Sequence, residues 1–295
     1  LNRTPSSAGN RKTWTWSAWI KRANIGSRQI LFSADDNATH ATYFILELQS
    51  DNNLRCLAGQ ETASATCVKE TTAMIRDTTN WYHLVFKFDA ANTSAVWYIN
   101  GQEVTDLNSS TNPSNQDFQV NATTQHFLGR FGSSLGTSYF DGYMAETHLL
   151  IGSAKAHTDF GETNDNGVWV PKKTSFATSD YGSNGFKLEY KQTGTSANSS
   201  GIGADTSGND SHLTPTNLAA TDITEDTPTN NFATLNSADA QSLGNATLSE
   251  GNLKFDGADG DTCRGRSTIM VANGKWYAEF RVANNHKLRI SVTDN

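Results

Sequence analysis

The sequence lacks the features that mark a membrane protein, a secretory precursor or a domain built on disulfides. It contains no apolar run long enough for a membrane span and no basic segment leading into a signal-peptide core. Three cysteines among 295 residues are too few for a disulfide framework. Cys56 and Cys67 could face each other across a hairpin, but we favour two half-buried thiols in a protein folded in a reducing cytosol.

Positive charge is also scarce. The chain has 23 Lys and Arg against 30 Asp and Glu, which leaves a formal net charge of −7. This balance argues against nucleic acid as a partner, because phosphate contacts depend on Lys and Arg. The chain starts at Leu1 rather than at a methionine, so we expect it to be a processed product or part of a longer protein.

What the sequence does contain is strand-like alternation rich in Asn, Thr, Ser and Gly. In Trp81 to Phe88, the residues Tyr82, Leu84, Phe86 and Phe88 fall on one face of a strand. Asn100-Gly101 can form a type I′ hairpin turn, and no window shows a sustained helical repeat. The prediction is an all-β fold, an antiparallel β-sandwich. The further strands that we expect lie at 13–21, 29–34, 43–49, 53–58 and 185–190.

Composition divides the chain into three regions. We expect a first β-sandwich over residues 1–175 and a polar connecting segment over 176–226, whose strand at 185–190 could complete that sandwich. Strand signals restart from 227 to 295, notably in STIMVANGKWYAEFRV at 267–282. This last region either completes the first domain or opens a second one, and we favour a second, partial β domain.

Three motifs occur in a fixed order: WYHLVFKFD, VWYINGQEV and FDGYMAE, at 81–89, 96–104 and 140–146. Together they resemble the laminin-G-like, concanavalin A-like jelly-roll family over roughly residues 10–155. The segment DTSGN at 205–209 resembles a turn of the same superfamily, and 267–282 is similar to the opening of a SPRY-like β-sandwich. The wider arrangement of segments 3–22, 160–172, 205–209 and 227–236 resembles fibre and structural proteins of marine bacteriophages. The resemblance implies a virion protein with carbohydrate-binding-type sandwiches.

Catalytic signals are missing from the sequence. A glycosidase needs two carboxylates across one cleft, whereas Glu47, Glu146, Glu189 and Glu279 each stand alone on an expected strand. No spacing to a carboxylate or nucleophile marks His83 as a base. We therefore expect no enzyme activity and no required cofactor.

Binding residues can be suggested more readily. Calcium prefers several hard oxygens from one loop, which makes Asp205 and Asn209 the candidate ligands. The alternative, which we favour, is an Asx turn in which these side chains cap the local backbone. Aromatic faces can stack on sugar rings, and Tyr139, Phe131 and the nearby Asp141 are the candidate carbohydrate-binding residues, with Tyr139 and Phe131 expected at the surface.

The leading hypothesis is a phage virion fibre or adhesin that works as a homo-oligomer. Its loops would bind host-surface glycan, and it would assemble with other virion proteins on the particle surface after folding in the host cytoplasm. The alternative is a capsid-decorating or tail-assembly protein that makes only protein contacts. A polysaccharide-acting enzyme is the most distant of the three hypotheses.

Overall fold

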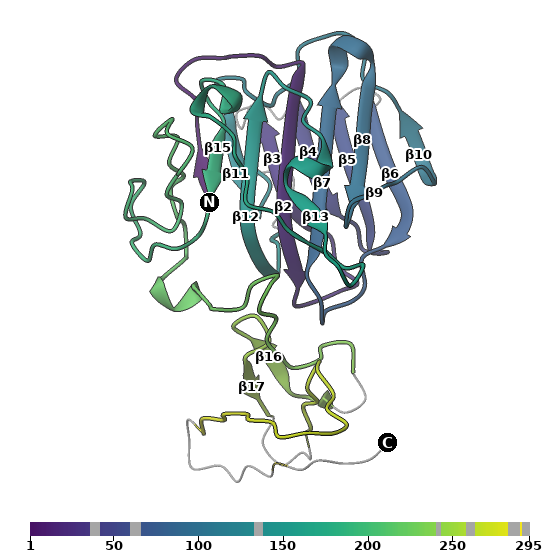
Figure 1. Ribbon diagram of the computed structural model, residues 1–295, viewed down its shortest axis with the longest axis vertical. Coiled ribbons are helices and arrows are strands. Elements are labelled where there is room, and N and C mark those ends of the chain that lie inside the picture. The colour runs from purple at the N-terminus through teal and green to yellow at the C-terminus, as the bar shows by residue number, and fades with distance from the viewer. Residues whose placement is uncertain are drawn as a thin grey trace.

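The computed structural model describes residues 1–35, 42–59, 66–132, 138–239, 243–257, 263–282 and 290. Two antiparallel β-sheets lie face to face and form a sandwich, with a small hairpin unit below it (Figure 1). The fold is therefore the all-β, antiparallel sandwich that the strand pattern predicted, and it fits the jelly roll that the family resemblance implied. No helix in the described part of the chain has the length and apolar character needed to cross a membrane.

One sheet has seven strands and the other six. The seven-stranded sheet has the order β1 (Asn2–Arg3), β11 (Gln125–Leu128), β3 (Gln29–Asp35), β4 (Tyr43–Leu48), β5 (Asn53–Gly59), β6 (Cys67–Met74) and β10 (Leu107–Thr111). The six-stranded sheet has the order β15 (Phe186–Leu188), β12 (Gly142–Ile151), β2 (Thr13–Arg22), β7 (Tyr82–Asp89), β8 (Ser94–Ile99) and β9 (Gln102–Glu103).

Two short hairpins lie outside the sandwich sheets. They consist of β13 (Gly161–Thr163) with β14 (Trp169–Pro171), and β16 (Thr247–Ser249) with β17 (Lys254–Asp256). Four 3-10 turns are described as well: η1 (Ala90–Asn92), η2 (His157–Asp159), η3 (Thr178–Tyr181) and η4 (Ala220–Asp222).

The main core lies between the two sheets and is rich in aromatic rings. Trp14 of β2 stacks on Phe88 of β7 with 4.9 Å between ring centroids, and Phe44 from the opposite sheet meets Trp14 edge-on at the same distance. Leu84, Phe86 and Phe88 all have 0% exposure. The alternation in the sequence thus predicted the inward face of β7 correctly, because successive strand residues point to opposite sides of a sheet.

The turn between β8 and β9 also follows from local chemistry. Asn100 and Gly101 have φ of 48° and 76°, and Ile99 pairs with Gln102 across them. Two successive positive φ values define the type I′ hairpin that Asn-Gly favours. A Cβ on Gly101 would lie 2.4 Å from Trp169, so this glycine also lets β14 approach the turn closely.

The outward face of the six-stranded sheet is covered as well, which the alternation did not predict. The segment from η2 to η3 crosses this face in front of β2 and β7 (Figure 1). Its Phe160 and Tyr181 pack on Val85 and Leu150 in a second buried cluster. A single amphipathic strand pattern cannot reveal such a cover, because the covering residues come from another part of the chain.

Cys56 and Cys67 could either form a disulfide or remain free thiols, and the structure distinguishes the two possibilities. Cys56 and Cys67 are buried free thiols on neighbouring strands, as favoured from the sequence. Burial, with the nearby Cys67 thiol as a lesser cause, raises the pKa of the Cys56 thiol. Both therefore act as small core residues.

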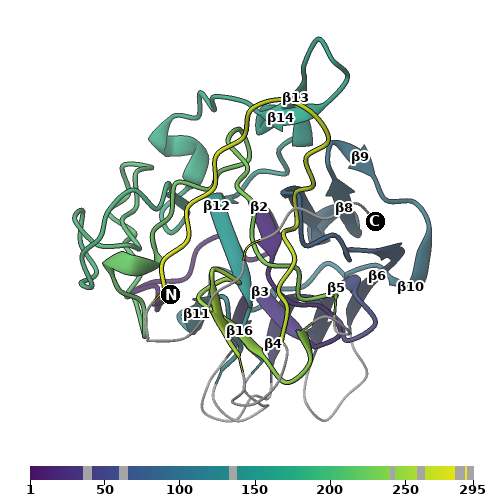
Figure 2. The same ribbon diagram turned by 90° about the horizontal axis from the view of Figure 1, so that it is seen from below.

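The C-terminal region docks on the lower end of the six-stranded sheet, as seen from below in Figure 2. The ammonium of Lys21 is fully buried and contacts Asp226 Oδ2 at 2.8 Å. Tyr143 donates a hydrogen bond to the carbonyl of Gly251 at 2.7 Å, and the Asn252 amide donates to the Ala23 carbonyl at 2.5 Å. Residues 226–252 are thus held to the sandwich by polar contacts.

The strand expected within 267–282 does not form. Apart from a single bridge between Leu235 and Ser267, this stretch has no strand pairing among the described residues, and the side chains of Trp276 and Tyr277 are 66% and 86% exposed. An alternating segment becomes a strand only when neighbouring strands bond its backbone and its apolar face is buried.

Candidate functional site

The aromatic residues predicted to meet sugar lie in different environments. Tyr139 is 53% exposed, and the Arg130 guanidinium lies 6.0 Å from its ring centroid. Phe131 is only 2% exposed and packs with Ile30 and Ile45 on the outer side of the seven-stranded sheet. The expected surface position of Phe131 is therefore wrong: its ring covers a sheet face instead of pointing to solvent.

Asp141 lies at the lower end of the sandwich, just before β12. Its backbone carbonyl accepts a hydrogen bond from the Ala23 amide at 3.0 Å, while its side chain is exposed. Atoms crowded around the carboxyl group desolvate it in part even though the residue reaches solvent, which raises its pKa, and the neighbouring Arg22 opposes that shift. A role for Tyr139 and Asp141 in sugar binding stays a prediction.

The carboxylate of Asp205 is surrounded by hydrogen-bond donors. Oδ1 accepts from the backbone amides of Lys187 and Ser207, at 2.8 and 2.9 Å. Oδ2 accepts from the Ser207 hydroxyl and the Ser211 amide, both at 2.9 Å. The Asn209 amide nitrogen donates to two backbone carbonyls. These contacts are those of an Asx turn that ties the loop to β15.

Metal binding gains no further support from this geometry. No group of three or more His, Cys, Asp or Glu side chains in the described ranges could hold a metal ion. Because four donors already occupy the Asp205 oxygens, a calcium ion there would have to displace them. Calcium binding by Asp205 and Asn209 stays a prediction.

His83 has a hydrogen-bonding pattern that defines its tautomer. The Trp169 indole nitrogen can only donate, and it lies 3.0 Å from Nδ1 of His83, so Nδ1 accepts. The proton of the neutral ring is then on Nε2, which donates to the Ser17 hydroxyl at 2.9 Å. A ring in this state cannot take a proton from Ser17. The Ser17–His83 contact therefore joins the sheet to its cover and does not activate a nucleophile.

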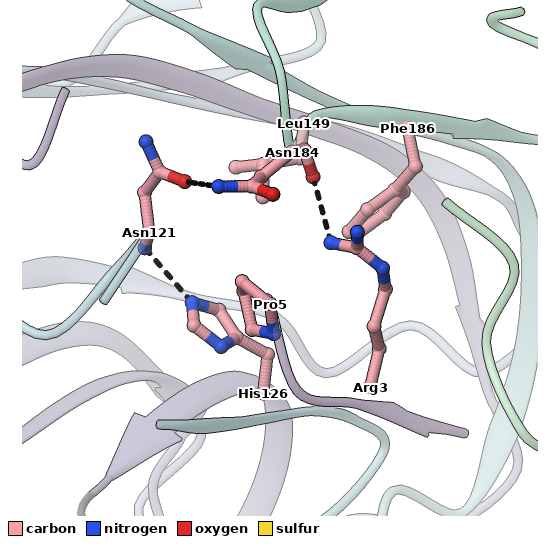
Figure 3. A pocket seen from close by; sticks show the side chains of 7 residues that line it. All are labelled: Arg3, Pro5, Asn121, His126, Leu149, Asn184 and Phe186. Carbon is pink, nitrogen blue, oxygen red and sulfur yellow. Dashed lines mark hydrogen bonds between the residues drawn. The ribbon is translucent and has the colours of Figure 1, made fainter. Parts of the chain in front are cut away.

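A small hollow lies where the N-terminal strand crosses the side of the sandwich (Figure 3). Its polar side chains bond to one another: the Asn184 amide donates to Asn121 at 2.6 Å, and the Asn121 backbone amide donates to His126 at 2.8 Å. Its cavity volume is about 10 Å³, which is room for a single water. The hollow is therefore a structural polar cluster and not a ligand site.

A larger groove lies on the opposite side, where the edges of the two sheets separate. β9 pairs only with Tyr98 and Ile99 of β8, so the rest of β8 borders this opening. We call it the edge groove, and its cavity volume is about 220 Å³. It is lined by Lys69 of β6, by Ala95, Val96 and Trp97 of β8, and by Glu103, Val104, Thr105 and Leu107.

The edge groove combines an aliphatic surface with two charged side chains. Ala95, Val96, Val104 and Leu107 supply apolar surface, and Trp97 is fixed beneath by its indole bond to the Lys69 carbonyl at 3.1 Å. This lining can meet an apolar ring face and also bond polar groups at its rim.

Glu103 connects the groove to an aromatic pair beside it. Its Oε2 accepts a hydrogen bond from the Tyr98 hydroxyl at 3.2 Å. The Tyr98 ring stacks on His157 with centroids 4.4 Å apart. The position of the Glu103 carboxylate is thus set by the sheet edge and by the η2 cover together.

The sequence reading missed Lys69 and Glu103. The Asn100-Gly101 turn could have indicated that Glu103 follows a hairpin at a sheet edge. Lys69 carried no such signal, because it meets β8 and β10 only when the sandwich closes.

Comparison with known protein families gives a match over the sandwich. A family model described as the concanavalin A-like lectin/glucanases superfamily matches residues 2–153, which include β1 to β12. No curated protein matches the chain.

Several solved structures are similar to about half of the chain. A Bacteroides ovatus protein is 18% identical, with a TM-score of 0.38, and the match covers 53% of this chain and 42% of that one. Domain 4 of AbnA, a GH43 extracellular arabinanase from Geobacillus stearothermophilus in complex with arabinotriose, is 21% identical, with a TM-score of 0.38 and coverage of 50% and 64%. The Ruminococcus gnavus IT-sialidase CBM40 bound to α2,3-sialyllactose is 13% identical, with a TM-score of 0.39 and coverage of 54% and 94%. The chain thus spans less than two thirds of the length of the first two proteins.

Proposed function

This chain belongs to the concanavalin A-like lectin/glucanases superfamily, and we propose that it is a non-enzymatic module that binds carbohydrate in the edge groove. The observation that carries the proposal is the pairing of an aliphatic groove surface with Lys69 and Glu103 at its walls. A pyranose ring has an apolar C–H face and a rim of hydroxyl groups. The first suits the aliphatic surface, and the second suits the charged side chains.

The size of the edge groove supports a small ligand. Its volume of about 220 Å³ lies below the roughly 300–1,000 Å³ of pockets that enclose drug-sized molecules. One sugar unit would sit in the groove while the rest of a glycan extended into solvent. Contact with one unit gives weak affinity for each site, which several copies on one assembly would raise.

The edge groove has a single carboxylate in its described lining, which favours binding over hydrolysis. Glu103 is the only acidic residue among the eight described residues that line it. Glycosidases of the usual kind need a second carboxylate across the scissile bond.

Binding can be tested on a glycan array, with the affinity of the best glycan measured by calorimetry, both with and without calcium. We expect Glu103→Ala to weaken binding about tenfold, because a bond from a sugar hydroxyl to a charged acceptor is lost. Glu162→Ala is the matched control: Glu162 is an exposed carboxylate on β13, away from the groove, and its removal should leave affinity unchanged. Equal affinity of the Glu103→Ala variant and the wild type would rule out the edge groove as the site.

We further propose that the module is part of a phage virion fibre or adhesin, present as a homo-oligomer on the particle surface. The resemblance of 3–22, 160–172, 205–209 and 227–236 to phage structural proteins supports this role. The alternative is a capsid-decorating or tail-assembly protein whose surface contacts only other virion chains.

Antibody labelling of intact particles, viewed by electron microscopy, tests the virion role. We expect label at fibre tips for an adhesin and over the shell for a decorating protein. Labelled material that separates completely from the particles on a density gradient would contradict both roles.

A further inference from the structure

Lys69 is the only cation among the eight described residues that line the edge groove. Its side chain points inward between the two sheets, because its partner in the β5–β6 register is the core residue Cys56. Only 7% of Lys69 is exposed. A nearly buried ammonium group therefore lies at the wall of the groove.

Among the described residues, no opposite charge is paired with this ammonium group. It donates a hydrogen bond of 2.8 Å to the hydroxyl of Ser110 on β10. No carboxylate in the described part of the chain lies within 4.0 Å of it, whereas the fully buried ammonium of Lys21 is paired with Asp226 at 2.8 Å. Burial of an ion without an opposite charge is costly, so the Lys69 site favours an incoming anion.

We infer that the edge groove recognises an anionic sugar, with the carboxylate or sulfate of the sugar at Lys69. The inference rests on the proposed function and adds the chemical class of the ligand. A charge-assisted bond to Lys69 is roughly twice as strong as a neutral one, so it dominates the polar part of recognition. Glu103 on the other wall accepts bonds from hydroxyl groups and repels a second anion. The geometry thus points to a sugar unit with one anionic group.

The net charge of the chain limits where the attraction for an anionic sugar can come from. At −7, the protein as a whole repels acidic polysaccharides, so the attraction must come from the local Lys69 site. Such binding should depend on the presence of the anionic group rather than on the total charge of the glycan.

The test uses the full chain on an array of neutral, uronic-acid-containing and sulfated glycans with matched backbones. We expect at least a tenfold preference for one anionic class over its neutral counterpart. Lys69→Met should lower the affinity for that class about 10- to 100-fold and leave neutral glycans within about twofold. Lys69→Arg should retain most of the preference, and thermal unfolding should verify that both variants are folded.

The outcomes separate this inference from the proposed function. Equal binding of neutral and anionic glycans in the groove would overturn the inference while carbohydrate binding stands. Loss of neutral and anionic binding together in a folded Lys69→Met variant would also overturn it, because Lys69 would then shape the groove and not select charge. An array with no binding at all would overturn both. The anionic class that responds to Lys69→Met tells whether carboxylate or sulfate is the natural group.

Discussion

Lowering the pH from 7 to 5 is expected to reduce the free energy of unfolding by about 6 kcal/mol, because three buried histidines must stay neutral in the folded protein. Burial is the main cause that lowers the pKa of His83 and of His148 to about 3 and that of His126 to about 4, from 6.5 for a free side chain. In the unfolded chain all three take up a proton as the pH falls through 6.5. The folded state resists, so the stability that these three groups contribute is lost below pH 6.5 and is constant above it.

The size of the effect follows from the unfolded pKa. A pH of 5 lies 1.5 units below the pKa of a histidine in the unfolded chain. Protonation of each such histidine therefore favours the unfolded state by about 2 kcal/mol. The hydrogen bonds support this for His126: Nδ1 lies 2.8 Å from the Thr124 carbonyl and must donate, while Nε2 accepts from the Asn121 amide at 2.8 Å. A second proton on this ring would oppose the Asn121 N–H.

Urea unfolding at a series of pH values between 4.5 and 7.5 measures this dependence. The slope of the free energy of unfolding against pH should correspond, below pH 6, to about three protons taken up on unfolding. Carboxylates whose pKa is lowered in the folded protein, such as Asp77 and Glu189, add to it only near pH 4.5.

His148→Phe provides the control for one of these groups. Nδ1 of His148 contacts the Tyr181 hydroxyl at 2.9 Å, and Nε2 has no hydrogen-bond partner in the part of the chain that the structure describes, so a phenyl ring of similar shape fits this site with little loss. In this variant the number of protons taken up on unfolding, obtained from the slope of the free energy of unfolding against pH, should fall from three to two. A slope unchanged by this substitution, or a stability that is flat between pH 7 and 5, would contradict the role assigned to the buried rings.

Asp226→Ala is expected to destabilise the docking of residues 226–252 by about 3–5 kcal/mol, because it leaves the Lys21 ammonium buried without its carboxylate. Lys21 also donates to Asn231 Oδ1 at 2.8 Å and to the Phe232 carbonyl at 2.6 Å, but neither group carries a charge. Trp81 would lose its indole bond to Asp226 Oδ1 as well. The loss appears as local detachment if the sandwich itself is more stable than this contact.

Hydrogen exchange of the amides in 226–252, followed together with global unfolding, distinguishes local from global loss. The double variant Lys21→Met with Asp226→Leu removes both charges and should recover much of the lost stability, since an apolar pair suits a buried site. The exposed pair of Lys191 with Glu189 is the comparison, and Lys191→Ala should cost less than about 1 kcal/mol. A similarly small effect of Asp226→Ala would show that the Lys21 contact does not hold the segment.

The sequence predicted the part of the fold that depends on neighbouring residues. Alternation located β2, β3, β4, β5 and β7 within one or two residues, and Asn100-Gly101 located the β8–β9 turn. Both signals are local, because strand alternation repeats every two residues and positive φ values are set by the residue type at the turn. Three ordered motifs were enough to indicate the family.

The candidate site could not be predicted in the same way. Phe131 follows a β-strand beside a glycine, like a surface loop residue, yet Ile30 and Ile45 bury its ring. Lys69 reads as an ordinary polar strand residue until β8 and β10 enclose it. In each case the decisive neighbours come from other strands or loops.

The sequence by itself determined that this protein is an all-β sandwich, where strands β2 to β5 and β7 lie, and where the chain turns between β8 and β9. Only the tertiary structure decided that both faces of the six-stranded sheet are covered, that His83 joins the sheet to its cover, and that Lys69 and Glu103 share a groove. The physical reason is that strand formation depends on short-range periodicity. Burial and the pairing of charges depend on which distant segments meet, as Lys21 and Asp226 do across 205 residues.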